Sequence, residues 1–260
     1  MLILLPPSEG KARPIRGKPL ELEALGSPIL TSARAAVLDA LVALCADDPA
    51  TATATLGIPA TQPELTALNA ALRTSATARA DAVYTGVLFD ALGLATLDAA
   101  ARRRATARVA VTSSLFGMVR PGDRIPSYRL SGDAVLPSLG PVAAHWRAHL
   151  GPAVTDAVGS GLLIDLRSTM YAAFWRPPSE MASRVATVRV LHEANGKRSV
   201  VSHFNKATKG RIVRALVEDG RTPRTPAALA AALIELGWHV EVGAPTAKGT
   251  QLDVVVTHVG

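Results

Sequence analysis

The sequence predicts a mixed α/β (α+β) fold with a central buried sheet flanked by helices. Short apolar runs at 1–5, 107–113 and 161–166 are typical of buried strands. They alternate along the chain with segments of helical periodicity, which favours a layered α/β arrangement. Of the 260 residues, 48% are hydrophobic, enough for a sizeable core. No linker-like segment divides the chain, so we expect residues 1–260 to form one domain.

The first part of the chain is expected to open with a strand and to continue through helices. The strand is MLILL at 1–5, and Pro6 and Pro7 stop it. The next helix carries an apolar face, with Thr31 or Ser32 as its N-cap. The segment 47–62 is small and polar and contains Pro49 and Pro59. Helices are predicted at 31–46, 63–73, 87–93 and 98–105.

The second part returns to strands. After the apolar strand at 107–113, a loop rich in Gly, Pro and Arg covers 117–132. Further strands are predicted at 161–166, 184–192, 198–204, 238–243 and 251–257, with 195–197 as a hairpin turn between the second and third of these. Helices are predicted at 139–150, 205–219 and 226–237.

The chain is strongly basic. Lys and Arg total 28 against 21 Asp and Glu, a formal net charge of +7. Such a charge attracts polyanions over about 8–10 Å at physiological salt, and nucleic acid is the commonest such partner. Alternatively, the excess charge only maintains solubility. The single Cys45 excludes an internal disulfide and any multi-cysteine metal site, and its apolar surroundings favour a core position.

The N-terminal run MLILLPPSEGK does not resemble a signal peptide. It has no basic segment, and two prolines interrupt a short apolar run. No stretch approaches about 20 uninterrupted apolar residues, so we expect no membrane span and a cytoplasmic location.

The segment 202-SHFNKATKG-210 is the first candidate phosphate site. Asn205 is expected to be a helix N-cap, which places Lys206 and Lys209 in the first helical turn. Cations there are unfavourable for an isolated helix because its N-terminus is already partly positive. Free backbone N–H groups together with two ammonium groups favour phosphate binding. The alternative is a pair of ordinary surface lysines.

Two loops are further candidates. The segment 6-PPSEGK-11 leaves a strand and presents Lys11, but it lacks the G-x-x-x-x-G-K-[ST] pattern of an ATP-binding loop. The segment 120-RPGDRIPSYR-129 contains Arg120, Tyr128 and Arg129, and an aromatic ring among arginines can stack on a base while the guanidinium groups hold phosphates. The alternative is a proline-rigidified surface loop in which Asp123 pairs with the arginines.

The sequence shows no complete catalytic or metal motif. His145 and His149 have i, i+4 spacing but lack a third ligand, so we expect no metal site and no cofactor. No G-x-S-x-G elbow is present. If the protein is an enzyme, the polar side chains near strand ends are its candidate catalytic residues. They are Tyr84, Ser113, Asp165 and Ser168.

Several segments together resemble the bacterial YaaA (peroxide stress protein) family. They are MLIL with its Pro/Ser/Lys loop, 83-VYTG-86, 113-SSLFGMVRP-121, 127-SYRL-130, 164-IDLRSTMY-171, 195-NGK-197 and 202-SHFNKATKG-210. They occur in the family's order and extend from residue 1 to about 215. Where better-known members carry an acidic residue shortly after the serine matching Ser168, this chain has Thr169 and Met170.

The resemblance implies a cytosolic protein that protects bacteria during peroxide stress and limits oxidative DNA damage. It also implies a mixed α/β fold with a positively charged cleft, a helix-hairpin-helix-like element and DNA binding. The matching hairpin here is 56-LGIPAT-61. The family's residues map onto Lys11, Tyr84, Thr85, Gly86, Ser113, Gly117, Arg120, Pro121, Tyr128, Arg129, Ser168, Tyr171, Lys206 and Gly210, with Lys209 at a basic position.

The leading hypothesis is DNA binding in a basic cleft, with Tyr84 or Tyr128 stacking on an exposed base. The cleft residues are Lys11, Arg120, Arg129, Lys206 and Lys209. The alternative is an enzyme acting on a nucleobase or nucleotide in the same cleft. A DNA-binding protein should present a broad basic stripe, whereas an enzyme should present an enclosed site. Direct iron sequestration is a third possibility, for which the sequence contains no recognisable ligand set.

Overall fold

The computed structural model describes residues 1–59, 61–194, 196–200 and 202–257, with side chains omitted at 202–204. Its main element is a mixed sheet of eight strands in the described residues, in the order β11-β12-β9-β8-β1-β3-β4, with β10 paired to β9. The strands are β1 (Leu2–Leu5), β3 (Val109–Ser113), β4 (Gly117–Val119), β8 (Leu163–Asp165), β9 (Val185–Ala194), β10 (Lys197–Ser199), β11 (His239–Val242) and β12 (Thr250–Val256).

The centre of the sheet is parallel. Strands β12, β9, β8, β1 and β3 run in one direction, and the antiparallel strands β11 and β4 flank them. Leu4 of β1 pairs with Ala110 of β3 on one side and with Asp165 of β8 on the other. The loops that follow β1, β3 and β8 therefore meet at one edge of the sheet. We call this edge, formed by residues 6–11, 113–116 and 165–168, the carboxyl edge.

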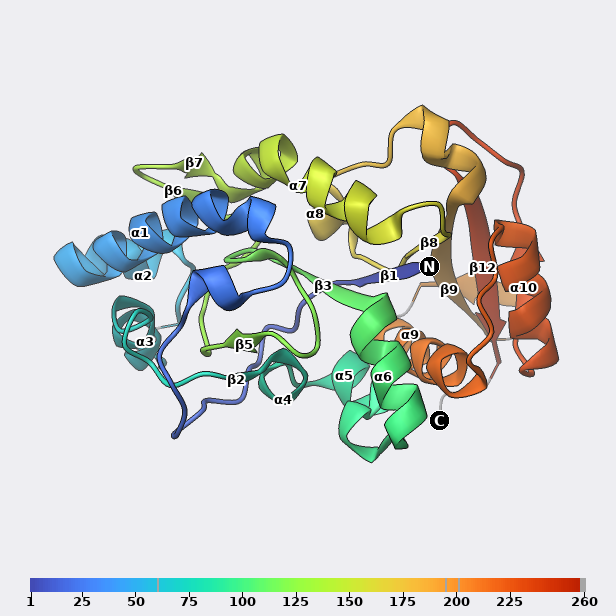
Figure 1. Cartoon of the computed structure of the whole chain (residues 1–260), viewed down its shortest axis with the longest axis horizontal. Coiled ribbons are helices and arrows are strands. Elements are labelled where there is room, and N and C mark those ends of the chain that lie inside the picture. Colours follow the sequence, from blue (N-terminus) through green and yellow to red (C-terminus); the bar gives the residue numbers. More distant parts are fainter. Residues whose placement is uncertain (60, 195, 201, 258–260) are drawn as a thin grey trace.

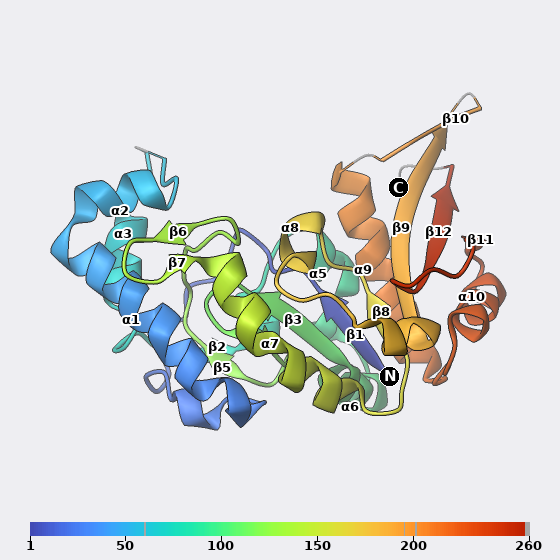
Figure 2. The same cartoon turned by 90° about the horizontal axis from the view of Figure 1, so that it is seen from above.

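Helices cover both faces of the sheet (Figures 1 and 2). Helix α7 lies on one face, and α5, α6 and α9 lie on the other, while α10 packs against β9, β11 and β12. Helices α1, α2 and α3 pack together beyond one end of the sheet. The helices are α1 (Thr31–Asp47), α2 (Pro49–Thr55), α3 (Glu64–Ala70), α4 (Ala80–Val83), α5 (Val87–Leu92), α6 (Ala99–Arg108), α7 (Val142–Val158), α8 (Thr169–Ala172), α9 (Ser202–Asp219) and α10 (Pro226–Glu235).

Smaller elements complete the fold. The strands β2 (Ala78–Arg79) and β5 (Arg124–Ile125) form one antiparallel pair, and β6 (Val135–Leu136) and β7 (Gly140–Pro141) form another. Short 3-10 helices are formed by Leu22–Ala24, Pro28–Leu30, Leu94–Thr96 and Ser179–Arg184.

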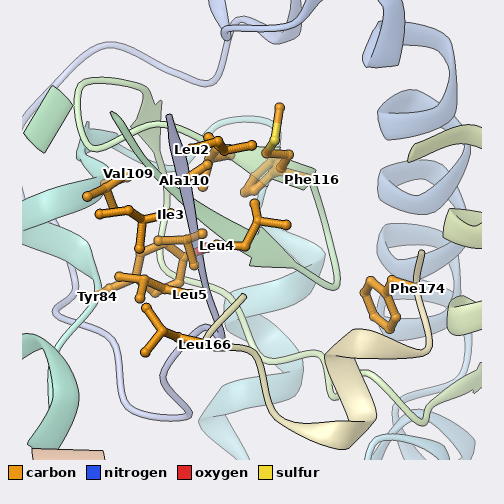
Figure 3. Packing of buried hydrophobic residues seen from close by; sticks show 14 of the residues in the cluster. Leu2, Ile3, Leu4, Leu5, Tyr84, Val109, Ala110, Phe116, Leu166 and Phe174 are labelled. Atoms are coloured by element: carbon orange, nitrogen blue, oxygen red, sulfur yellow. The ribbon is translucent and has the colours of Figure 1, made fainter. Parts of the chain in front are cut away.

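Strand β1 forms the middle of the core (Figure 3). All four of its side chains have 0% exposure, so both faces of this strand are covered. Burial on both faces is typical of parallel strands and explains why MLILL is an uninterrupted apolar run. Cys45 is buried in the same core, as the sequence predicts.

The structure confirms the predicted fold class. The segment 47–62 contains α2, which begins after Asp48, whose side chain accepts a 3.0 Å hydrogen bond from Thr51 N. Three local predictions are corrected. The strand predicted at 198–204 ends at Ser199, and α9 begins at Ser202. Asn205 therefore lies inside the helix rather than at its N-cap. Helix α7 continues past its predicted end to Val158, with Pro152 in its interior.

Helix α1 and the preceding turn are apolar. Within the described residues, Pro28–Asp47 is the one helical stretch that meets the length and hydropathy of a membrane span. It contains buried residues such as Val37 and Leu41, and α1 packs against α3 and α7. A core helix meets the same criteria. Helices α2 and α3 flank the predicted hairpin at 56–61, where residue 60 lies outside the described residues, so the helix-hairpin-helix element stays a prediction.

Candidate functional site at the carboxyl edge of the sheet

Lys11 lies where the loop after β1 turns back against the residues that follow α4. It forms an isolated antiparallel bridge with Tyr84, and Ala12 N donates a 2.8 Å hydrogen bond to Val83 O. The Lys11 Nζ atom donates to Ser8 O at 2.9 Å and to Glu9 O at 3.4 Å. The same nitrogen lies 4.2 Å from the centre of the Tyr128 ring and 5.8 Å from that of Tyr84. The loop thus folds the lysine amine back onto two aromatic rings.

These surroundings lower the pKa of Lys11 from 10.5 to about 7. Burial of the nitrogen is the main cause, because it removes the water that hydrates an ammonium group. The positive charge of Arg129 lowers this pKa further, and Glu9 opposes the change. The ring faces of Tyr84 and Tyr128 also favour the charged form, although such contacts contribute only about 0.5–2 kcal/mol. Lys11 is consequently able to lose its proton near neutral pH.

Beneath the lysine, three hydroxyl groups form a buried hydrogen-bonded chain. The Tyr84 and Tyr128 hydroxyl oxygens are 3.0 Å apart, and that of Tyr128 is 2.8 Å from Ser113 Oγ. Ser113 Oγ also accepts a hydrogen bond from Phe116 N. Burial raises the pKa of both tyrosines, so their phenol groups remain protonated at physiological pH. The three hydrogen-bonded hydroxyl groups can therefore relay or donate a proton, and neither tyrosine is a phenolate.

Arg129 lies beside Lys11 and is fixed through its backbone. Asn69 Nδ2 donates to Arg129 O at 2.7 Å, and Arg129 N donates to Asn69 Oδ1 at 2.9 Å. The guanidinium group is 3.9 Å from the exposed carboxylate of Glu9. Its buried Nε has no hydrogen-bond partner among the described residues. Arg129 is therefore held in place while part of its donor capacity is unused.

At the end of β8, Asp165 and Arg167 form a buried ion pair. Arg167 donates to the two carboxylate oxygens at 2.9 and 2.7 Å, and it also donates to Tyr171 O and Trp175 O. The carboxylate predicted as a candidate catalytic group is thus occupied by a structural partner. Lys209 of α9 reaches the same edge and donates a 2.9 Å hydrogen bond to Leu166 O. Burial lowers the pKa of Lys209, and Asp165 opposes this change.

Lys206 lies one helical turn before Lys209 and is exposed. Since α9 begins at Ser202, neither lysine belongs to its first turn, and the predicted geometry at this helix start is wrong. Both still lie on the N-terminal half of α9, which reaches the carboxyl edge through Lys209. The N-terminal end of a helix carries a partial positive charge that adds to these two cations.

Some predicted site residues lie elsewhere or are unavailable. Arg120 donates to Ala107 O and Val109 O at the amino end of β3, so it lies at the opposite edge of the sheet from Lys11. Tyr84 and Tyr128 are only 3% and 2% exposed, which leaves no free ring face for a stacking base. Ser168 is exposed at the start of α8 and makes no side-chain capping bond. A single cleft lined by all five predicted cations does not form.

The two histidines of α7 have structural contacts. His145 Nε2 is 3.0 Å from Ala33 O, and His149 Nδ1 is 2.8 Å from His145 O. Among the described residues, no group of three or more His, Cys, Asp or Glu side chains is arranged to hold a metal ion.

Sequence reasoning missed two residues that shape the site. The Arg167–Asp165 ion pair could have been predicted from the sequence, because an arginine two residues after an aspartate at a strand end can fold back and bind that carboxylate. Asn69, from α3, fixes Arg129 across 60 positions of sequence, and no local pattern indicates such a contact.

Comparison with known proteins identifies the family. Residues 1–241 match the family model described as peroxide stress protein YaaA. The chain is 53% identical over 261 residues to a UPF0246 protein of Streptomyces coelicolor, covering 100% of both chains. It is 41% identical over 245 residues to a UPF0246 protein of Corynebacterium efficiens, covering 93% of this chain and 95% of the relative. The chain therefore belongs to the peroxide stress protein YaaA family.

Proposed function

We propose that this protein binds DNA in the cytoplasm during peroxide stress and that the cations of the carboxyl edge hold its phosphates. Membership of the peroxide stress family supports the biological setting. The net charge of +7 supports a polyanionic partner. The observation that carries the proposal is the convergence of Lys11, Arg129 and Lys209 on the ends of adjacent strands, with exposed Lys206 one turn away.

The position of these cations agrees with a general rule for parallel sheets. Ligands bind outside the carboxyl ends of the strands, at the point where the strand order reverses. Here the chain continues from β1 to β3 on one side and later to β8 on the other, so the reversal lies at β1. A DNA strand crossing this edge would pass Arg129, whose side chain is partly exposed, and Lys206, which is exposed.

Replacing Lys206 with Ala tests this proposal. We expect weaker binding to every DNA sequence and a salt dependence whose slope, log Kd against log salt, falls by about 1, because one phosphate contact is lost. Fluorescence anisotropy across a salt series measures both quantities on single-stranded and duplex DNA.

Lys248 provides the matched control. It is an exposed lysine in the turn before β12, at the amino edge of the sheet, and Lys248→Ala should leave affinity and slope unchanged. Equal effects of the two substitutions would show that DNA does not select the carboxyl edge. No binding at low salt would overturn the proposed function.

A second candidate is an enzyme that acts on a nucleobase or nucleotide at the same edge. The buried amine of Lys11 above the Tyr84–Tyr128–Ser113 chain favours it, since such groups supply a base and proton donors in an enclosed setting. A rise in Tm with mononucleotides, in a protein that shows no affinity for DNA, would favour this candidate over the first.

A further inference from the structure

We infer that Lys11 is a nucleophile that forms an imine with the aldehyde of an abasic deoxyribose in DNA, which would make the protein a lyase for abasic sites. This inference rests on the proposed DNA binding and specifies the substrate class of the same edge. Imine formation needs a neutral amine with a free lone pair, a position for the carbonyl and a cation for the flanking phosphate. The first and the last of these requirements correspond to features around Lys11.

The hydrogen bonds of Lys11 suit a neutral amine. A neutral amine has two N–H groups, and Nζ has two carbonyl partners, Ser8 O at 2.9 Å and Glu9 O at 3.4 Å. Both bonds can therefore remain when the proton leaves, and the lone pair is then free to attack a carbonyl carbon. Glu9 is exposed and Ser8 is partly buried, so this loop borders the solvent from which a ligand arrives.

The surroundings of Lys11 favour the neutral form of its amine. Burial and the neighbouring guanidinium group of Arg129 lower the pKa of Lys11 to about 7. Desolvation and a nearby cation are the two means by which enzymes activate a lysine for Schiff-base chemistry. An ordinary lysine, with a pKa of about 10.4, is almost entirely protonated at neutral pH and reacts correspondingly slowly.

Arg129 is placed to hold the phosphate beside the abasic sugar. Its backbone is fixed by Asn69, and among the described residues its buried Nε lacks a partner. Arginine binds phosphate through paired N–H groups, so an unused donor next to the nucleophile fits a phosphate oxygen. Its contact with exposed Glu9, at 3.9 Å, is long enough to be exchanged for a stronger one.

The reaction balances without an added oxidant or reductant. The Nζ lone pair attacks C1′ of the ring-opened sugar, and the resulting carbinolamine takes up one proton from solvent and loses water to give a protonated imine. Water accepts a C2′ proton, the C2′–C3′ double bond forms as the C3′–O bond breaks, and the phosphate leaves with the electron pair. Water hydrolyses the imine and regenerates the amine.

Borohydride trapping tests the inference. Wild-type protein is incubated with a duplex containing one abasic site and reduced with borohydride, which converts the imine into a stable amine. We expect a covalent complex on a denaturing gel, with the adduct located on the peptide that contains Lys11. Its formation rate should rise with pH and level off above about pH 7, whereas the rate of an ordinary amine continues to rise towards its pKa of about 10.4.

Variants and a parallel binding assay separate the outcomes. Lys11→Gln should reduce trapping by more than about tenfold, the change expected when the main nucleophile is removed, while Lys248→Gln should leave it unchanged. Adduct mapping on the wild-type protein gives an answer even if Lys11→Gln misfolds. Binding to the abasic duplex without an adduct would overturn this inference and leave DNA binding standing. An adduct on another lysine or on the Met1 amine would overturn the assignment to Lys11, and absence of all binding would overturn both proposals.

Discussion

Replacing Arg167 with Met is expected to lower the free energy of unfolding by about 3–5 kcal/mol. The substitution leaves the carboxylate of Asp165 buried without its partner, and an unpaired buried charge is strongly unfavourable. It also removes donors to the carbonyl groups of Tyr171 and Trp175, which connect the end of β8 to α8 and the segment after it. Urea unfolding followed by circular dichroism measures the change.

The ion pair of Arg189 with Asp253 is the matched control. It has a similar two-bond geometry, at 2.8 and 2.6 Å, but the arginine side chain is 48% exposed. Arg189→Met should therefore lower stability by only about 0–1 kcal/mol. If both substitutions had equally small effects, the Asp165–Arg167 pair would not stabilise the carboxyl edge.

Replacing Lys11 with Met is expected to remove a pH dependence of stability. The folded protein lowers the pKa of Lys11 from 10.5 to about 7, so between these values the unfolded chain binds one more proton than the folded chain. The stability of the wild-type protein therefore rises with pH across this window, and below about pH 7 the contribution of Lys11 is constant. The rise amounts to roughly 2–3 kcal/mol between about pH 7 and pH 9.5.

Lys11→Met should lose this rise, because methionine has a similar length and no titrating group. Other groups titrate in the same range but are common to both proteins, so the difference between the two unfolding curves isolates Lys11. A constant difference in stability between about pH 7 and pH 9.5 would contradict the perturbed lysine.

The sheet could be predicted from sequence because its central strands are buried on both faces. The runs at 1–5, 107–113 and 161–166 correspond to β1, β3 and β8, which meet at the carboxyl edge. Since parallel strands present their carboxyl ends together, Lys11 and Asp165 could be placed near one another in principle. The position of α2 also had a local signal in Asp48 and Pro49, an N-cap followed by a proline at N1.

The details of the site could not be predicted because long-range contacts determine them. Arg120 and Arg129 share one loop, but β4 and β5 form within or beside it and direct the two arginines to opposite edges of the sheet. The enclosure of Lys11 depends on Tyr128, 117 positions away, as much as on its own loop. The sequence predicts Tyr84 or Tyr128 as a stacking residue, but both are buried. Their burial depends on the packing of the whole core, which no local pattern indicates.

Lysine footprinting with and without DNA tests the central claim, that DNA contacts the carboxyl edge of the sheet. An acetylating reagent modifies accessible amines, and mass spectrometry of the digested protein reports the extent of modification at each lysine. We expect DNA to protect Lys206 and Lys209 and to leave Lys18 and Lys248, which lie away from this edge, unchanged. Protection of Lys18 or Lys248 without protection of Lys206 would contradict the proposed binding surface.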